Sequence, residues 1–121
     1  MITLTKDTID KKDIDRLIRW LKKYPRLTKG PETKKIERKW SKWIGRKYSV
    51  FCNSGSSANL LMLQTLLELK KINVGDKVVV PALAWATDLA PVMQLGLEPT
   101  LCDINLQDLS VDCKHLEELF I

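Results

Sequence analysis

The residues best suited to chemistry form the small-residue loop Asn53-Ser54-Gly55-Ser56-Ser57-Ala58-Asn59. Gly55 would let the backbone approach a ligand closely and adopt a positive φ. Ser56 and Ser57 would offer hydroxyls and backbone N–H groups at a helix amino terminus, where unpaired donors and the helix dipole favour an anion. Serine, asparagine and glycine before a helix are equally typical of N-capping. The pattern therefore predicts either a phosphate site or a helix cap.

Other kinds of site lack their residues. The glycine spacing fits neither of the common nucleotide-binding patterns, GxxxxGK followed by Ser or Thr and GxGxxG. The GxSxG pattern of serine hydrolases is absent, and His115 is the sole histidine that could act as a base. Cys52, Cys102 and Cys113 are an odd number without a CxxC pair. We therefore expect buried, reduced thiols, no disulfide framework and no metal site.

Strands and helices are predicted to alternate around this loop, which favours an α/β sheet with right-handed crossovers. In such a sheet, ligands bind beyond the carboxyl ends of the strands. The loop follows one predicted strand, and Trp85 follows the next, which is nearly all valine as expected for a strand covered on both faces. The predicted strands span residues 48–52, 77–80 and 98–104, and the predicted helices span 56–71, 87–95 and 113–121.

Two helices are predicted ahead of this region, over residues 10–24 and 31–44. Apolar residues repeat at helical spacing in both of them, and Pro25, Pro31 and Gly45 mark their ends. Trp40 and Trp43, three residues apart, are expected to lie in the core or at a subunit contact. We therefore predict an amino-terminal helical segment at 1–47 and the start of a larger α/β domain at 48–121.

Charge is divided unevenly along the chain. Residues 1–50 hold 16 Lys and Arg against 6 Asp and Glu (+10), whereas residues 51–121 hold 4 against 9 (−5). A basic half could bind nucleic acid, or its cations could cover solvated helix faces beside a site for an anionic substrate. No stretch has the length of a membrane span, and the amino terminus lacks the apolar core of a signal peptide. We therefore expect a cytoplasmic protein.

Several motifs together resemble the DegT/DnrJ/StrS family of sugar aminotransferases, which are pyridoxal-phosphate (PLP) enzymes of fold type I. The resemblance covers nearly the whole chain, and it lies in the order and spacing of motifs that are individually weak. Besides the loop, these motifs are Leu27-Thr28-Lys29-Gly30-Pro31, Gly45-Arg46-Lys47-Tyr48, Gly75-Asp76-Lys77-Val78-Val79-Val80-Pro81, Trp85-Ala86-Thr87, Gly96-Leu97-Glu98-Pro99 and Asp103-Ile104. The resemblance implies the amino-terminal portion of an aspartate aminotransferase-like large domain.

The resemblance also implies a site. Gly55, Ser56 and Ser57 would hold the phosphate of PLP, and Trp85 would stack on the pyridine ring, with core filling as its alternative role. Asp103 would be structural. The lysine that forms the Schiff base, and the aspartate that pairs with the pyridine nitrogen, lie beyond residue 121 in this family. We therefore assign no catalytic residue and expect the chain alone to be inactive.

Two reactions are known in the family that the chain resembles. Most members transfer an amino group, usually from glutamate, to a nucleotide-linked keto sugar of polysaccharide or deoxyamino-sugar synthesis, and they work as homodimers. A minority are 3-dehydratases of 4-keto-6-deoxy sugars, in which a histidine replaces the Schiff-base lysine. The chain is similar to this branch, as well as to some aminotransferases, in Ser56-Ser57-Ala58-Asn59-Leu60-Leu61, Trp85 and Leu95-Gly96-Leu97. We expect the commoner aminotransferase reaction and no nucleic-acid or membrane partner. A basic nucleic-acid-binding module is the rival interpretation from another class.

Overall fold

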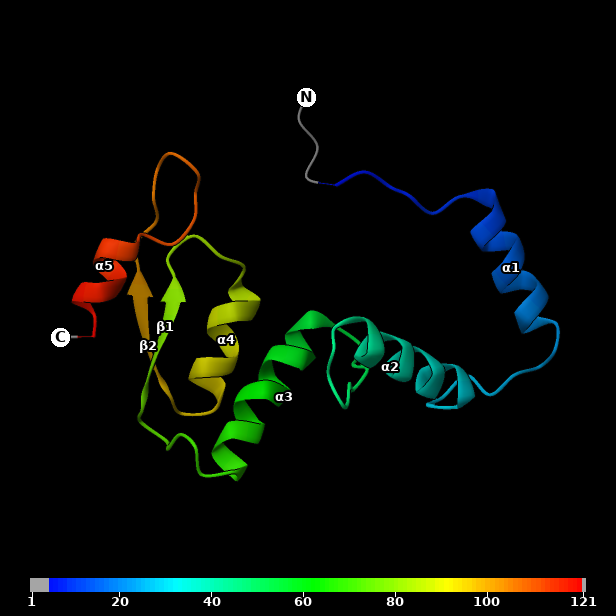
Figure 1. Cartoon of the computed structure of the whole chain (residues 1–121), viewed down its shortest axis with the longest axis horizontal. Helices are drawn as coiled ribbons and strands as arrows, with labels where there is room; N and C mark the ends of the chain where they lie inside the picture. The colour runs from blue at the N-terminus through cyan, green and yellow to red at the C-terminus, as the bar shows by residue number, and fades with distance from the viewer. Residues whose placement is uncertain (1–4, 121) are drawn as a thin grey trace. The chain divides into compact units, whose positions relative to one another are not determined.

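A computed structural model describes residues 5–120, and it divides the chain into two compact units, Met1–Phe51 and Cys52–Ile121. The domain boundary between residues 47 and 48 stays a prediction. Elements alternate in the second unit as expected for an α/β fold (Figure 1). The first unit contains α1 (Lys11–Leu21) and α2 (Pro31–Trp43), and the second contains α3 (Gly55–Glu68), β1 (Lys77–Pro81), α4 (Ala86–Gln94), β2 (Glu98–Cys102) and α5 (Cys113–Glu118).

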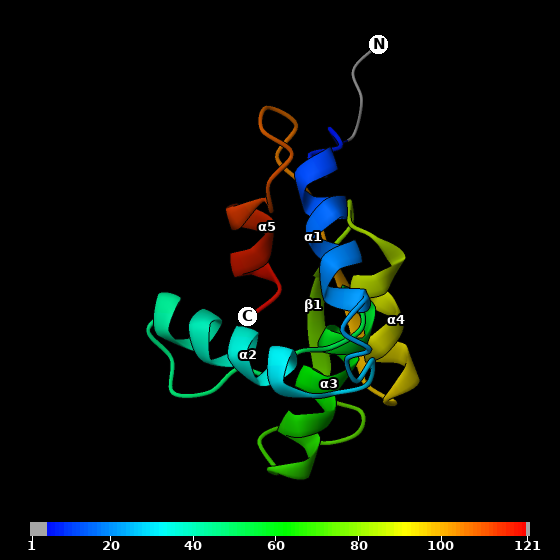
Figure 2. The same ribbon diagram turned by 90° about the vertical axis from the view of Figure 1, so that its right-hand side faces the viewer.

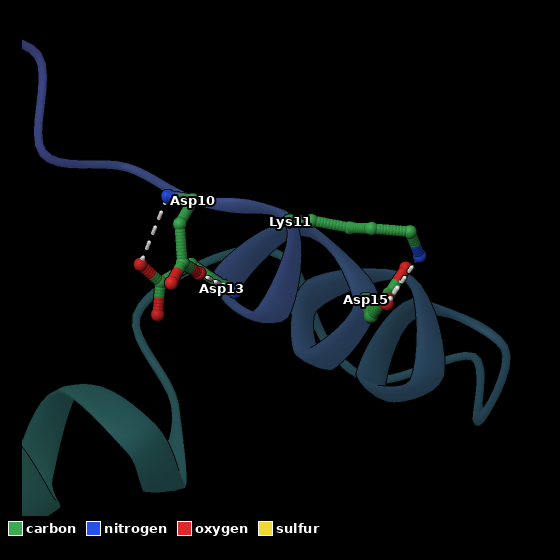
Figure 3. A network of polar contacts seen from close by, with 4 residues as sticks. All are labelled: Asp10, Lys11, Asp13 and Asp15. Carbon is green, nitrogen blue, oxygen red and sulfur yellow. Dashed lines mark hydrogen bonds and ion pairs between the residues drawn. The ribbon is translucent and has the colours of Figure 1, made fainter.

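Helix α1 begins with a capping box. The Asp10 carboxylate accepts a hydrogen bond from the Asp13 backbone N–H at 3.0 Å, and the Asp13 carboxylate accepts one from the Asp10 N–H at 3.4 Å (Figure 3). These two bonds satisfy donors that the first turn of a helix leaves without a partner. One turn later, Lys11 and Asp15 form an exposed ion pair with an N···O distance of 2.8 Å. The cap, rather than the ion pair, is therefore expected to hold this end of α1.

This difference gives a first prediction. Asp10→Ala removes the cap and should cost about 1 kcal/mol of helix stability. Asp15→Asn removes the ion pair with Lys11 and should cost less than about 0.5 kcal/mol, since exposed pairs of this kind contribute little. Amide hydrogen exchange at Asp13 and Ile14 measures both effects. Equal acceleration of exchange in the two variants would contradict the leading role of the cap.

Helix α2 starts and stops where the sequence predicts. Pro31 is its first residue, and Gly45 follows its end with a φ of 68°, a conformation that glycine adopts without strain. Trp40 and Trp43 do not lie in a core of the described residues, because they are 52% and 76% exposed, and the alternative of a subunit contact stays a prediction. At a spacing of three residues they face each other instead, with ring centroids 4.9 Å apart.

The predicted strand at residues 48–52 is not formed. Its backbone does not pair with another strand, and in the described part of the chain only β1 and β2 form a sheet. Two side-chain bonds hold this segment to α2 instead. The Phe51 N–H donates to Glu37 Oε1 at 3.0 Å, and Ser41 Oγ donates to Ser49 Oγ at 2.8 Å. The valine and aromatic content favours an extended backbone, but a strand also needs a neighbour.

The second unit is built around a βαβ unit. Strands β1 and β2 are parallel, with Lys77 opposite Glu98 and Pro81 opposite Cys102, and α4 forms the crossover between them. Helices α4 and α5 lie on opposite sides of this strand pair (Figures 1 and 2). The buried core is small, since β1, α4 and the turn before β2 bring together three buried apolar side chains, which are Val80, Val92 and Leu97.

The cysteines follow the prediction of buried thiols only in part. Cys102, on β2, is completely buried, and this burial raises the pKa of its thiol. Cys113 is exposed because it opens α5 at the surface of the unit. The expectation of burial is therefore wrong for Cys113.

Candidate anion-binding site

The small-residue loop that begins at Asn53 forms a helix cap. Ser54 is the N-cap of α3, and its Oγ accepts a hydrogen bond from the Ser57 backbone N–H at 3.1 Å. The same Oγ donates its proton to Ser57 Oγ, also at 3.1 Å. The prediction that the Ser57 N–H would be available to a ligand is therefore wrong, because the cap already uses it. The Ser57 hydroxyl proton remains available to an acceptor.

The donors that remain are well placed for an anion. Gly55 and Ser56 are the first two residues of α3, so their backbone N–H groups have no carbonyl partner within the helix. The expected positive φ of Gly55 is wrong, because its backbone is already helical. A Cβ built on Gly55 would meet no atom within 4 Å, so the space beside it is open. Two N–H groups without a partner in the helix thus lie at an accessible helix terminus, which favours a bound phosphate.

Trp85 stands at the carboxyl end of β1, as predicted. Strand β1 ends at Pro81, and the next residue, Ala82, still donates its N–H to the Cys102 carbonyl of β2 at 2.7 Å. Trp85 then caps α4 with backbone atoms, and its side chain is 70% exposed. The ring therefore fills no core within the described residues, and stacking on a flat ligand stays its predicted role.

One residue of this region was not identified from the sequence pattern. Asn59, on the first turns of α3, donates from Nδ2 to the Thr87 carbonyl at 3.2 Å and to Asp88 Oδ1 at 2.9 Å. It thereby joins the start of α3 to the start of α4, directly after Trp85. The sequence did contain a sign that another donor is needed here. Pro91 has no N–H, so the Thr87 carbonyl, four residues earlier, lacks its helical donor.

Asp103 and His115 have structural positions. The Asp103 backbone N–H donates to His115 Nδ1 at 3.0 Å, and the Asp103 carboxylate accepts from the Ile104 N–H at 2.8 Å. The bond to His115 fastens α5 to the chain that leaves β2. The expectation that Asp103 is structural and that His115 has no role in the site stays a prediction.

The basic residues of the first unit converge on an open cleft of about 420 Å³. Lys34, Arg38 and Lys42 lie four residues apart along α2 and so share one face of the helix. Arg46 and Lys47 line the same cleft from the segment that follows. Five of the sixteen basic residues at 1–50 thus line one cleft, and a solvated helix face stays one of the two interpretations that the charge asymmetry allows.

Glu37 lies beside this cleft and yields a pH prediction. The hydrogen bond from the Phe51 N–H, followed by the Lys29 ammonium group, lowers the pKa of Glu37. A lowered pKa in the folded state means that this tie is complete above the ordinary glutamate pKa and is lost as the pH falls through the lowered value. The Phe51 amide resonance should therefore titrate with a midpoint below that of glutamate in an unfolded peptide.

Substitution separates this effect from other carboxylates. Glu37→Gln keeps an acceptor but has no proton to bind, so the acid titration of the Phe51 amide should disappear. Glu32→Gln, on the same helix, should leave that titration unchanged. A Phe51 titration that persists in Glu37→Gln would show that another group causes it.

None of the helices in the described residues combines the length and the apolar content that a membrane crossing requires.

Residues 7–120 match the family model of the DegT/DnrJ/EryC1/StrS aminotransferases. The chain belongs to this family. The match contains the loop at Ser54–Ser57, Trp85 and all the described elements, so the resemblance inferred from the motifs is confirmed.

Individual relatives sharpen the comparison. GDP-4-keto-6-deoxy-D-mannose 3-dehydratase of Escherichia coli O55:H7 is 40% identical over 94 residues, which are 76% of this chain and 24% of that protein. A crystal structure of GDP-4-keto-6-deoxymannose-3-dehydratase with a trapped PLP-glutamate geminal diamine has a TM-score of 0.85 and 33% identity, over 96% of this chain and 30% of that one. The chain thus spans roughly a quarter to a third of the length of these relatives.

A third relative represents the other reaction. A structure from Streptococcus pneumoniae, assigned as a sugar aminotransferase and solved in its PLP form, has a TM-score of 0.79 and 27% identity, over 97% of this chain and 29% of that one. The aminotransferase-like α/β fold and the PLP dependence of the family are therefore confirmed. The expected preference for amino transfer is not, since the dehydratases have the higher identities.

Proposed function

We propose that this chain holds the phosphate of PLP within an enzyme that modifies a nucleotide-linked keto sugar. The observation that carries the proposal is the start of α3, where the N–H groups of Gly55 and Ser56 have no partner within the helix and the space beside Gly55 is open. Trp85 supplies an exposed ring at the carboxyl end of the neighbouring strand. When bound, PLP supplies an electron sink for the substrate.

For the reaction, we favour 3-dehydration of a GDP-linked 4-keto-6-deoxy sugar. The support is the higher identity to 3-dehydratases, 40% and 33%, than to the aminotransferase, 27%. Amino transfer from glutamate to a keto-sugar nucleotide is the second candidate, supported by the high TM-score of that relative. A homodimeric enzyme of the cytoplasm, active in polysaccharide synthesis, is part of the same proposal.

A titration followed by NMR tests the phosphate site. Adding PLP to the ¹⁵N-labelled chain should shift the amides of Gly55 and Ser56 and the indole N–H of Trp85. Pyridoxal, which has the same ring without the phosphate, should shift the Trp85 signal and leave the two amides nearly unchanged. Equal shifts of the two amides with both ligands would overturn the assignment of the loop to the phosphate.

The reaction is tested on the complete reading frame of the gene. The expressed enzyme is incubated with a GDP-linked 4-keto-6-deoxy sugar, PLP and glutamate, and the product is identified by mass spectrometry. A product that has lost the 3-hydroxyl supports dehydration. A product that carries a new amino group and keeps that hydroxyl would establish the aminotransferase instead.

A further inference from the structure

Helix α4 contains a proline that leaves one carbonyl without its helical donor. Pro91 lies in the sixth of nine positions of α4 and has no backbone N–H. The carbonyl that this N–H would have bonded, four residues earlier, is that of Thr87. Asn59 supplies the missing donor, since its Nδ2 lies 3.2 Å from the Thr87 oxygen. The half-buried carbonyl is therefore satisfied from another helix rather than from its own.

The second hydrogen of the Asn59 amide is also used. It is directed to Asp88 Oδ1 at 2.9 Å, and the Asp88 N–H in turn donates to the Trp85 carbonyl at 2.9 Å. One primary amide thus fixes two successive residues of the first turn of α4, and through Asp88 the backbone of Trp85. Since a carboxylate acceptor strengthens a hydrogen bond, the bond to Asp88 is the stronger of the two.

In the first half of α4, Leu89 packs against the core cluster but is only partly buried. Trp85 gives α4 no side-chain cap, and its own ring is 70% exposed. The buried contacts of α4 lie in its second half, where Val92 is 1% exposed. Asn59, by contrast, lies about one turn after Ser54, Gly55 and Ser56 on α3. It is therefore the side chain that connects the loop end of α3 to the residue that carries the exposed ring.

We propose that Asn59 is a positioning residue, which sets the place of the Trp85 ring relative to the anion-binding start of α3. This inference rests on the proposed function, because it assigns the ring a distance to keep from a ligand held at Gly55 and Ser56. Asn59 itself does not touch the ligand. It determines whether one PLP molecule can contact the phosphate site and the Trp85 ring at the same time. Loss of Asn59 should therefore weaken PLP binding by displacing the ring.

The experiment compares two amides of the same helix. Asn59→Leu removes both bonds to α4, whereas Gln64→Leu removes only a bond within α3, from Gln64 Nε2 to Glu68 Oε1 at 2.8 Å. In Asn59→Leu, we expect a shifted Trp85 indole signal without any ligand, and PLP binding about tenfold weaker. In Gln64→Leu, the Trp85 indole signal and the PLP affinity should both match those of the parent chain. Equal effects of the two substitutions would overturn the proposal.

A second substitution separates position from stability. Pro91→Ala restores an N–H four residues after Thr87, so α4 can satisfy that carbonyl by itself. In the double variant Asn59→Leu/Pro91→Ala, the melting temperature should return toward that of Pro91→Ala alone. The Trp85 signal and the weak PLP binding should not recover, because the link to α3 is still absent. Recovery of PLP binding would show that Asn59 acts only through stability.

The two proposals can fail separately. If Asn59→Leu moves the Trp85 signal in the free chain while PLP leaves the Gly55 and Ser56 amides of the parent chain unshifted, the positioning stands and the phosphate site is refuted. If PLP shifts those amides and Asn59→Leu changes neither the Trp85 signal nor the affinity, the phosphate site stands and the positioning role is refuted.

Discussion

Val92→Asp is expected to unfold the second unit. Val92 is 1% exposed and packs with Val80 and Leu97, which are the other buried members of the same cluster. An aspartate there would be a buried charge without a partner, which costs several kcal/mol. Domains are stable by only about 5–15 kcal/mol in total, and a unit with so few buried side chains lies at the low end. We therefore expect no cooperative thermal transition for this unit and a collapse of amide dispersion over residues 52–120.

The neighbouring residue provides the control. Met93 is on the same turn of α4 but is 61% exposed, so Met93→Asp adds the same charge at the surface. Surface substitutions of this kind usually change stability by less than about 0.5 kcal/mol. Circular dichroism melts of the two variants measure the difference. A Val92→Asp chain that melts like Met93→Asp would mean that the cluster around Val92 does not hold the unit together.

Ser57→Glu is expected to abolish phosphate binding while the helix stays intact. Ser57 is the third residue of α3, and a glutamate at this position after a serine N-cap forms a capping box. The helix should therefore be as stable as before, or slightly more stable. Its carboxylate, however, would occupy the place of the anion. A like charge at about 4 Å opposes binding by up to roughly 4 kcal/mol near a protein surface, so we expect PLP affinity to fall on the order of 100-fold.

The control places the same charge further along the helix. Met62 is 60% exposed on α3, and Met62→Glu should weaken PLP binding by less than about threefold, since exposed charges at a distance are screened. Affinities are read from the NMR titration described above, and helicity from circular dichroism. Unchanged PLP affinity in Ser57→Glu would remove the start of α3 from the phosphate site.

The sequence predicted best the features that depend on neighbouring residues. The valine run at β1, the proline at the start of α2 and the terminating glycine Gly45 act through local backbone geometry, and each is found where expected. The segment at residues 48–52 failed, because a strand depends on a partner that is remote in sequence. The positive φ expected of Gly55 is wrong for a local reason. The helix begins at Gly55, one residue earlier than predicted, so the backbone there is helical.

The candidate site was predictable to the same extent. Gly55, Ser56, Ser57 and Trp85 belong to motifs that can be found along the chain, although their binding of PLP stays a proposal. The sequence pattern left open whether the Ser57 N–H would bond to a ligand or to the Ser54 side chain. In the structure it donates to Ser54 Oγ. Asn59 was missed because its partners, Thr87 and Asp88, lie almost thirty residues away.

The parallel register of β1 and β2 also bears on how the second unit forms. Lys77 pairs with Glu98 and Pro81 with Cys102, so every pair in the sheet joins residues 21 apart (98 − 77 = 21 and 102 − 81 = 21). The chain must therefore close a loop of only that length, of which α4 takes up nine residues, and the entropy lost on closure grows slowly with loop length. Parallel sheets usually fold slowly because they join distant segments. We therefore expect this pair to form with a smaller entropy cost than a parallel pair of more distant segments.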